Sequence, residues 1–285
     1  MKFEVLASVA AAMTFALAMV GPALAADDVF RTTVGDLKVS MLSEAQREGG
    51  IDILIGASDQ DVKKFIPSGK YLNAVAAYLV QSPEGAILID TGYGTNLESN
   101  MRAVGVSPGD VRHLLITHSH GDHIGGLLND GRPAFPNADV YVAKLEYEWS
   151  SAMRESLDKY GQSVKIIAPG ELTDGGAEIL PGIRAIAAYG HTPGHTVYLL
   201  ESKGERLLIW GDLTHAMAIQ MPRPGVTVRY DFDTEQAAAS RKSVLEYLSR
   251  NGIPAAGMHV PYPGIGKIAP DLENPGGYSF EPLTK

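Results

Sequence analysis

The densest group of residues able to do chemistry is segment 117–123, whose sequence is Thr-His-Ser-His-Gly-Asp-His. It follows a short apolar run, and alternate side chains of an extended chain share one face, so His118 and His120 can converge on one ion. The glycine after them permits a sharp turn. Asp122 and His123 then begin a predicted helix and offer a second, adjacent site. Neutral imidazole and carboxylate are ligands for zinc, manganese and iron, so this segment predicts a metal centre.

Three other segments supply further candidate ligands, each beside an apolar run. They are His191 in Gly-His-Thr-Pro-Gly-His, Asp212 in Trp-Gly-Asp and His259 in Met-His-Val-Pro. Singly each is a weak signal, because a histidine beside glycine and proline is commonly a hydrogen-bonded loop residue. The four regions, when the third is extended to His215, contain seven of the eight histidines, and this clustering is the main signal. The chain has no cysteine, which excludes thiolate ligands, a thiolate nucleophile and disulfides.

The order of these segments resembles the metallo-β-lactamase superfamily, whose pattern is His-x-His-x-Asp-His followed by a distant His, then Asp, then His. The resemblance runs from about residue 36 to 268. It implies an α/β (α+β) fold, a four-layer αββα sandwich, with two divalent metal ions, zinc being the expected metal, between the ends of two sheets. By position it implies a first site of His118, His120 and His191, a second site of Asp122, His123 and His259, and a bridging Asp212.

Other residues near these segments carry weaker expectations. Asp90, in an Asp-Thr-Gly segment that recurs in the family, is expected to support the metal loops rather than to bind metal. His195 is expected to be structural or supporting, and His113, at the start of a strand, carries no assigned role. His215 stands three residues after Asp212, where lactonases often place a tyrosine that hydrogen-bonds the substrate oxygen. Its imidazole either donates the same bond, and then titrates near neutral pH in the rate profile, or packs away from the site.

The bridging aspartate and the missing cysteine argue against the antibiotic-hydrolysing members of the family. Asp212 points instead to the branch that contains glyoxalase II, homoserine-lactone lactonases and methyl parathion hydrolase. Segments 211–220 and 259–266 are most similar to the exported methyl parathion hydrolase group. Glyoxalase II fits less well, because glutathione thioesters are cytosolic and no basic C-terminal segment suited to glutathione is present.

The leading hypothesis is a dinuclear hydrolase of lactones or related esters, acyl-homoserine lactones among them. Two cations about 3.5–4 Å apart share a water and present hydroxide as the nucleophile, while Asp122 passes a proton to the departing alkoxide. The alternatives are a phosphotriester hydrolase of the methyl parathion type, a redox or persulfide-handling metalloprotein, and a non-catalytic metal-binding protein. The complete second site argues against the last two. The sequence leaves the physiological substrate, the native metal and the formation of a homodimer open.

Strands and helices alternate along the chain and are expected to position these residues. Segment 43–73 is less regular and is expected to form a long excursion that covers the site. Segment 217–232 is expected to wall an apolar pocket or to belong to the core. Strands are predicted at 36–42, 74–80, 86–90, 111–117, 140–142, 183–188, 197–200 and 207–210, and helices at 97–104, 122–128, 144–160 and 234–250, the last capped by Thr234 and followed by Gly252.

The first 25 residues have the features of a secretory signal. Lys2 is followed by an apolar run over 5–20, shorter than a bilayer span, and by Ala23-Leu24-Ala25. Cleavage after Ala25 is expected in preference to an uncleaved anchor. Residues 26–285 then form one hydrolase domain, periplasmic or secreted, without a stable membrane span.

The composition suits a globular protein, with 45% hydrophobic and 20% charged residues. The net charge is −9 and is unchanged by the expected cleavage, since the first 25 residues contain one lysine and one glutamate. An acidic surface repels phosphate backbones, so no nucleic-acid partner is expected. The expected partner is a small ester, lactone or phosphotriester.

Overall fold

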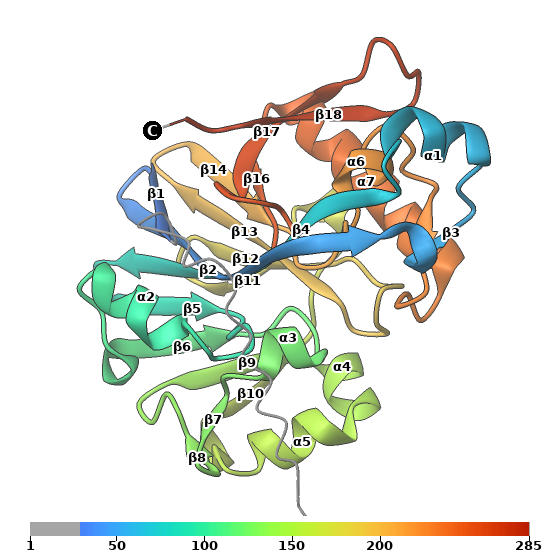
Figure 1. Cartoon of the computed structure of the whole chain (residues 1–285). Coiled ribbons are helices and arrows are strands. Elements are labelled where there is room, and N and C mark those ends of the chain that lie inside the picture. The colour runs from blue at the N-terminus through green and yellow to red at the C-terminus, as the bar shows by residue number, and fades with distance from the viewer. Residues whose placement is uncertain (1–28, 285) are drawn as a thin grey trace, which may run out of the picture.

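The computed structural model describes residues 29–284, and the predicted signal peptide at 1–25 lies outside them. Two seven-stranded sheets face each other, and helices cover their outer sides (Figure 1). Within residues 29–284, no helix combines the length and the apolar character needed to cross a membrane.

The first sheet is antiparallel from β1 to β5 and parallel from β5 to β10. Its strands, in spatial order, are β1 (Val29–Val34), β2 (Leu37–Gly50), β4 (Lys70–Ser82), β5 (Gly85–Ile89), β6 (Val111–Leu115), β9 (Asp139–Ala143) and β10 (Val164–Ile167). The second sheet is antiparallel except for the β14·β16 pair. Its strands are β11 (Ala177–Leu180), β12 (Ile183–Ala187), β13 (Thr196–Ser202), β14 (Glu205–Ile209), β16 (Ala255–Ala256), β17 (Ile265–Pro270) and β18 (Tyr278–Pro282).

The remaining elements are short, apart from α7 (Thr234–Asn251). The other helices are α1 (Asp59–Phe65), α2 (Leu97–Ala103), α3 (Gly121–Ile124), α4 (Lys144–Trp149), α5 (Ser151–Leu157) and α6 (Met217–Gln220), with 3-10 turns η1 (Ile51–Ile53), η2 (Pro108–Asp110), η3 (Gly161–Ser163) and η4 (Leu172–Asp174). Two small strand pairs join β3 (Leu54–Ile55) to β15 (Thr227–Val228), and β7 (Leu128–Asn129) to β8 (Arg132–Pro133).

Alternation along the strands builds three apolar layers. On β4, Tyr78 belongs to the core between the sheets, whereas its neighbour Leu79 belongs to the layer shared with α2 and α5. On β14, Ile209 faces the inter-sheet core and Leu208 packs in the layer that holds Leu245 of α7. Helix, sheet, sheet and helix therefore stack in that order, and the predicted four-layer αββα sandwich is confirmed.

The predicted excursion over 43–73 is wrong in its extent. β2 continues to Gly50 and pairs with β4 down to Lys70, so only residues 51–69 leave the sheet. The last six residues of β2 are partly or fully exposed on both faces of the hairpin, and their burial does not alternate. Because polar and apolar residues lose their period there, the sequence pattern does not predict a strand.

The eight predicted strands are present, with end shifts of a few residues except at the C-terminal end of β2. The sequence does not predict β1, β10, β11, β16, β17 and β18 of the two sheets, or the short strands β3, β7, β8 and β15. The helix predicted over 144–160 is two helices, because the Ser150 hydroxyl accepts from Met153 N and starts α5 afresh. α3 ends at Ile124 rather than near 128. The N-cap of α7 is Asp233, not Thr234.

The candidate chemistry gathers where strands of both sheets end. The segment with Asp90 follows β5, segment 117–123 follows β6, and Asp212 lies just after β14. His191 follows β12, and His259 follows β16. Loops at the ends of packed strands present side chains from a rigid support, so two sheets together supply one edge of the sandwich with these groups.

Candidate metal centre

Three imidazoles and one carboxylate surround a common point. His120 Nδ1 lies 3.1 Å from His118 Nε2 and 3.0 Å from His191 Nε2. Asp212 Oδ2 lies 3.5 Å from His118 Nε2 and 3.3 Å from His191 Nε2. Ligands of a tetrahedral zinc ion with bonds of about 2.0–2.1 Å lie about 3.3 Å apart. The four side chains therefore have the spacing of one tetrahedral ligand set.

A second group lies against the first and shares Asp212 with it. His259 Nε2 is 3.5 Å from Asp122 Oδ2, and His123 Nε2 is 3.8 Å from Asp122 Oδ1. Asp212 presents Oδ1 to His123 Nε2 and Oδ2 to His259 Nε2, each at 3.0 Å. Its carboxylate thus faces both groups. All seven predicted ligand side chains are brought together.

Four of the imidazoles are held from behind through the ring nitrogen that faces away from the cluster. The acceptors fix the proton on Nδ1, so the lone pair of Nε2 points inward. These contacts are His118 Nδ1 to Thr117 Oγ1 (3.0 Å), His123 Nδ1 to Asp90 Oδ2 (2.6 Å), His191 Nδ1 to Asp231 Oδ1 (2.8 Å) and His259 Nδ1 to Ala74 O (2.7 Å).

Two buried atoms at the centre of the cluster lack a hydrogen-bond partner. They are His123 Nε2 and Asp212 Oδ1, which lie 3.0 Å apart without hydrogen-bond geometry. Buried polar groups are rarely left unpaired, and a cation would satisfy the inward nitrogen and oxygen at once. A set of imidazoles and carboxylates without sulfur suits zinc and similar divalent ions. The residues present therefore fit a divalent metal centre.

The electrostatics of the cluster depend on one ionised carboxylate. Burial opposes the charge on Asp212, but the surrounding histidines, His123 foremost, hold its pKa well below the usual range. Burial also opposes protonation of His123, yet Asp212 and Asp90 raise the pKa of that ring well above its ordinary value. Burial lowers the pKa of His118 well below normal and that of His120 to about 4. Metal binding to this mixture of charged and neutral rings displaces protons.

The supporting residues that the sequence suggested lie just outside the cluster. Asp90 accepts hydrogen bonds from Thr117 N at 2.8 Å and Thr117 Oγ1 at 2.6 Å, which ties the end of β5 to the loop after β6. His195 Nε2 accepts from Asp212 N at 3.0 Å and so supports the loop that carries the shared carboxylate. His113 lies on β6 beside Tyr141, 3.5 Å from its hydroxyl, and takes no part in the cluster.

Glu146, on α4, is a supporting residue that sequence reasoning missed. It is fully buried, and its carboxylate accepts four hydrogen bonds. Oε1 accepts from Ser119 N (2.8 Å) and Ser119 Oγ (2.6 Å), and Oε2 accepts from Thr192 Oγ1 (2.6 Å) and Gly194 N (3.0 Å). A Cβ at Gly194 would collide with the Glu146 backbone, so glycine is required for this approach. The carboxylate thereby joins the loops that carry the first ligand group.

A buried arginine fixes the loop behind His191. Asp231 accepts from His191 Nδ1 through Oδ1, while its Oδ2 lies 3.8 Å from Arg241 of α7. Burial lowers the pKa of Arg241 to about 10, which leaves it charged at neutral pH. Its guanidinium also donates to the carbonyl oxygens of Leu213, Pro224 and Val226. Helix α7 therefore holds the chain between the shared carboxylate and Asp231.

His215 belongs to the cluster and is not packed away from it. Its Nε2 lies 3.1 Å from Asp212 Oδ2, and its ring stacks on His259 with centroids 4.7 Å apart at 27°. Burial lowers the pKa of His215 to about 4. Desolvation outweighs the opposing effect of Asp212, and this direction argues against a titration of the ring near neutral pH.

A cleft of about 610 Å³ opens over the cluster. Asp122, Asp212, His215 and His259 form part of its lining, and the walls come from the ends of β2 and β4, the loop after β5 and segment 229–230. In segment 217–232, Met221, Val226 and Val228 belong to the core, whereas Tyr230 and Phe232 are exposed. Phe232 packs edge-to-face on Trp149, whose ring lies 6.5 Å from His120.

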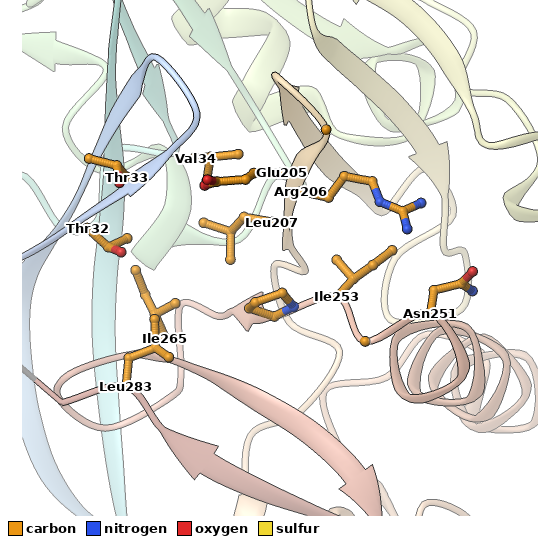
Figure 2. Close-up of a pocket in the computed structure, with 13 residues that line it drawn as sticks. Thr32, Thr33, Val34, Glu205, Arg206, Leu207, Asn251, Ile253, Ile265 and Leu283 are labelled. Carbon is orange, nitrogen blue, oxygen red and sulfur yellow. The ribbon is translucent and has the colours of Figure 1, made fainter.

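A second cavity, of about 300 Å³, lies at the opposite end of the sandwich, where β1 approaches the start of β14 (Figure 2). The carboxylate in its lining, Glu205, already accepts a hydrogen bond from Gly35 N at 2.9 Å. None of the His and Asp groups described above contributes to it. It is separate from the candidate centre.

The comparisons with known proteins agree with this geometry. The family model described as the metallo-beta-lactamase superfamily matches residues 71–250. An N-acyl homoserine lactonase of a Bacillus species is 28% identical over 209 residues, which covers 62% of this chain and 77% of the relative. The N-acyl homoserine lactonase of Bacillus cereus is 27% identical over 223 residues, covering 66% and 82%.

Two solved structures have closely similar folds. The hydrolase AbOPH, described as a member of the beta lactamase superfamily, has a TM-score of 0.81 at 26% identity, covering 90% of this chain and 98% of its own. AidC, described as a dizinc quorum-quenching lactonase in complex with a product, has a TM-score of 0.81 at 24% identity, covering 91% and 99%. At that identity the second likeness supports the fold alone.

The contacts of Glu146 yield a test of the supporting layer. Glu146→Gln keeps the shape of the side chain but turns an NH2 group toward backbone or hydroxyl donors. We expect zinc affinity to fall about 10–100-fold, since the loops that position His118 and His191 lose a shared anchor. Competition with a chromophoric chelator measures this. Glu148→Gln, an exposed change on the same helix, is the control, and equal zinc affinity in the two variants would contradict the role of Glu146.

Proposed function

Because the chain belongs to the metallo-β-lactamase superfamily and is a metal-dependent hydrolase, we propose that it hydrolyses lactones, N-acyl homoserine lactones among them, at a centre of two divalent ions. The observation that carries the proposal is a pair of ligand groups that share Asp212 on the floor of an open cleft. The relatives named N-acyl homoserine lactonase support the lactone as the preferred ester.

In this proposal each ligand group holds one ion, and zinc is the metal that the donor set suits. When bound, such ions polarise the ester carbonyl and lower the pKa of water toward neutrality. The first ion is assigned to His118, His120 and His191, the second to Asp122, His123 and His259, with Asp212 shared between them.

Two residues of the cleft are proposed to act on the substrate. The side chain of Asp122 is 20% exposed, so a leaving group in the cleft can reach it. Opening of a lactone ring produces an alkoxide that needs a proton, and Asp122 is placed to deliver one. His215, neutral because burial lowers its pKa to about 4, can donate a hydrogen bond to a substrate oxygen.

The rim of the cleft suits an acyl substituent. Trp149 and Phe232 form an exposed aromatic pair beside His120, which lines the cleft. Tyr230, another lining residue, lies beside His215, with ring centroids 5.9 Å apart. Exposed apolar side chains next to a polar floor match a ligand with a hydrolysable head and an apolar tail. This supports an acylated lactone over a small polar ester.

A substrate panel tests the proposed activity. Zinc-loaded protein is given N-hexanoyl-homoserine lactone, phenyl acetate and paraoxon, and kcat/KM is measured for each. We expect the highest kcat/KM for the lactone. The opposite order, with paraoxon preferred, would replace lactone hydrolysis by phosphotriester hydrolysis as the principal activity.

Asp212→Asn tests the shared carboxylate. Losing one anionic oxygen weakens both ligand groups at once, so the variant should bind fewer than two metal equivalents and lose activity on every ester class together. Metal content by atomic emission and kinetics on the same sample measure both effects. Asp174→Asn, an exposed change, serves as the control. Full metal content with normal turnover in Asp212→Asn would refute the bridging role.

His215→Ala should behave differently, because the proposed hydrogen bond concerns the substrate rather than metal retention. Turnover should fall by up to about 10²–10³-fold while metal content stays at the wild-type level. With the pKa of His215 at about 4, its ring stays neutral at higher pH, so the wild-type rate profile should show no step from this residue near neutral pH. Loss of metal in the variant would assign His215 to the ligand set instead.

A further inference from the structure

Among the charged residues that line the cleft outside the two ligand groups, one arginine has no ion-pair partner. Glu48 pairs with Lys70 at 2.8 Å, and Asp52 pairs with Arg229 at 3.2 Å. Within residues 29–284, Arg47 makes no ion pair with a carboxylate, and its hydrogen bond goes to the neutral hydroxyl of Tyr93 at 3.1 Å. The wall therefore carries a guanidinium whose charge is not balanced by a neighbouring side chain.

The β2·β4 register places Arg47 beside the strand that supports His259 of the second ligand group. Arg47 lies directly opposite Asn73, and side chains of opposed residues stand on the same face of a sheet. Both residues line the cleft. The residue after Asn73 is Ala74, whose carbonyl accepts from His259 Nδ1 at 2.7 Å. The strand that faces Arg47 thus also positions a candidate ligand.

Tyr93 holds the arginine in this place without neutralising it. The Tyr93 ring centroid lies 6.0 Å from the guanidinium carbon, close enough for a cation–π attraction. A guanidinium offers a planar fork of donors that matches a carboxylate with two hydrogen bonds. The net charge of −9 disfavours anions over most of the surface, so an unpaired cation makes the cleft wall a local exception that attracts an anion.

Lactone hydrolysis creates such an anion from a neutral substrate. Water adds to the ring carbonyl carbon, the ring C–O bond breaks, and the products are an alcohol, a carboxylate and one proton. Substrate and product are similar in size and differ by one charge. A cationic wall residue therefore raises the affinity for the anionic product more than the affinity for the neutral substrate.

We propose that Arg47 binds the carboxylate of the ring-opened acyl hydroxy acid and so makes the product an inhibitor that competes with the lactone. The inference rests on the proposed lactone hydrolysis. It assigns Arg47 to product affinity and not to the chemical step.

The test compares a neutral and an anionic ligand on the zinc-loaded full chain. N-hexanoyl-homoserine, the ring-opened acid, is used as an inhibitor of N-hexanoyl-homoserine lactone hydrolysis, and its binding is also measured directly by calorimetry. In Arg47→Gln we expect the inhibition constant to rise about 10-fold, since a charge-assisted contact is lost, with less than about a twofold change in KM. Arg47→Lys keeps the charge but loses the planar pair of donors, so its inhibition constant should lie between those of the wild type and Arg47→Gln.

Lys38→Gln is the matched control, because it removes the same charge from an exposed residue of the same strand, nine positions earlier and about 30 Å away. It should leave the inhibition constant unchanged. An unchanged inhibition constant in Arg47→Gln, or a parallel rise in KM and the inhibition constant, would overturn the proposal. Should the wild type not hydrolyse the lactone, the proposed function fails, while calorimetry with the acid still decides whether Arg47 binds its carboxylate.

Discussion

The buried carboxylate of Asp212 is the constraint on which the rest of the site depends. Five histidine nitrogens lie within 3.5 Å of its oxygens, and its pKa is held well below normal although the side chain is almost fully buried. An isolated anion in such a place would be strongly unfavourable. It is tolerated because positive charge surrounds it, whether from protons on imidazoles or from divalent ions. The architecture places those imidazoles around one residue.

Three more buried carboxylates hold the ligand loops from outside. Asp90, from the end of β5, holds the loop of His123, and Asp231, from the loop before α7, holds that of His191. Glu146, from α4, joins these two loops. Because Asp90 and Asp231 set the tautomers and orientations of their imidazoles and Glu146 fixes the loops, little reorganisation is needed when a cation binds. Arg241 extends the arrangement into α7, where Ser240 also donates to the carbonyl oxygen of Tyr189 beside the His191 loop. Helices α4 and α7 therefore help to fix the geometry of a ligand set to which they contribute no residue.

The ligand set could be predicted from the sequence, because its residues lie in short segments that each form a recognisable local motif. The ligand segment 117–123 and the order of His191, Asp212 and His259 form a pattern that needs no structure to be recognised. Glu146 could not be found, because its partners lie 27 and 46 residues away and its helix has no motif. The far half of β2 was missed because both its faces are wet and its periodicity is lost.

The candidate ligands come from both halves of the chain, and this distribution has a mechanical consequence. His118, His120, Asp122 and His123 follow a strand of the first sheet, whereas His191, Asp212 and His259 follow strands of the second. Ions bound by these residues would therefore connect the two sheets at the open edge of the sandwich and resist their separation. A ligand that binds only the folded state at a concentration 1,000 times its Kd adds about 4 kcal/mol of stability. The melting temperature of the protein would then rise with the concentration of free metal ion.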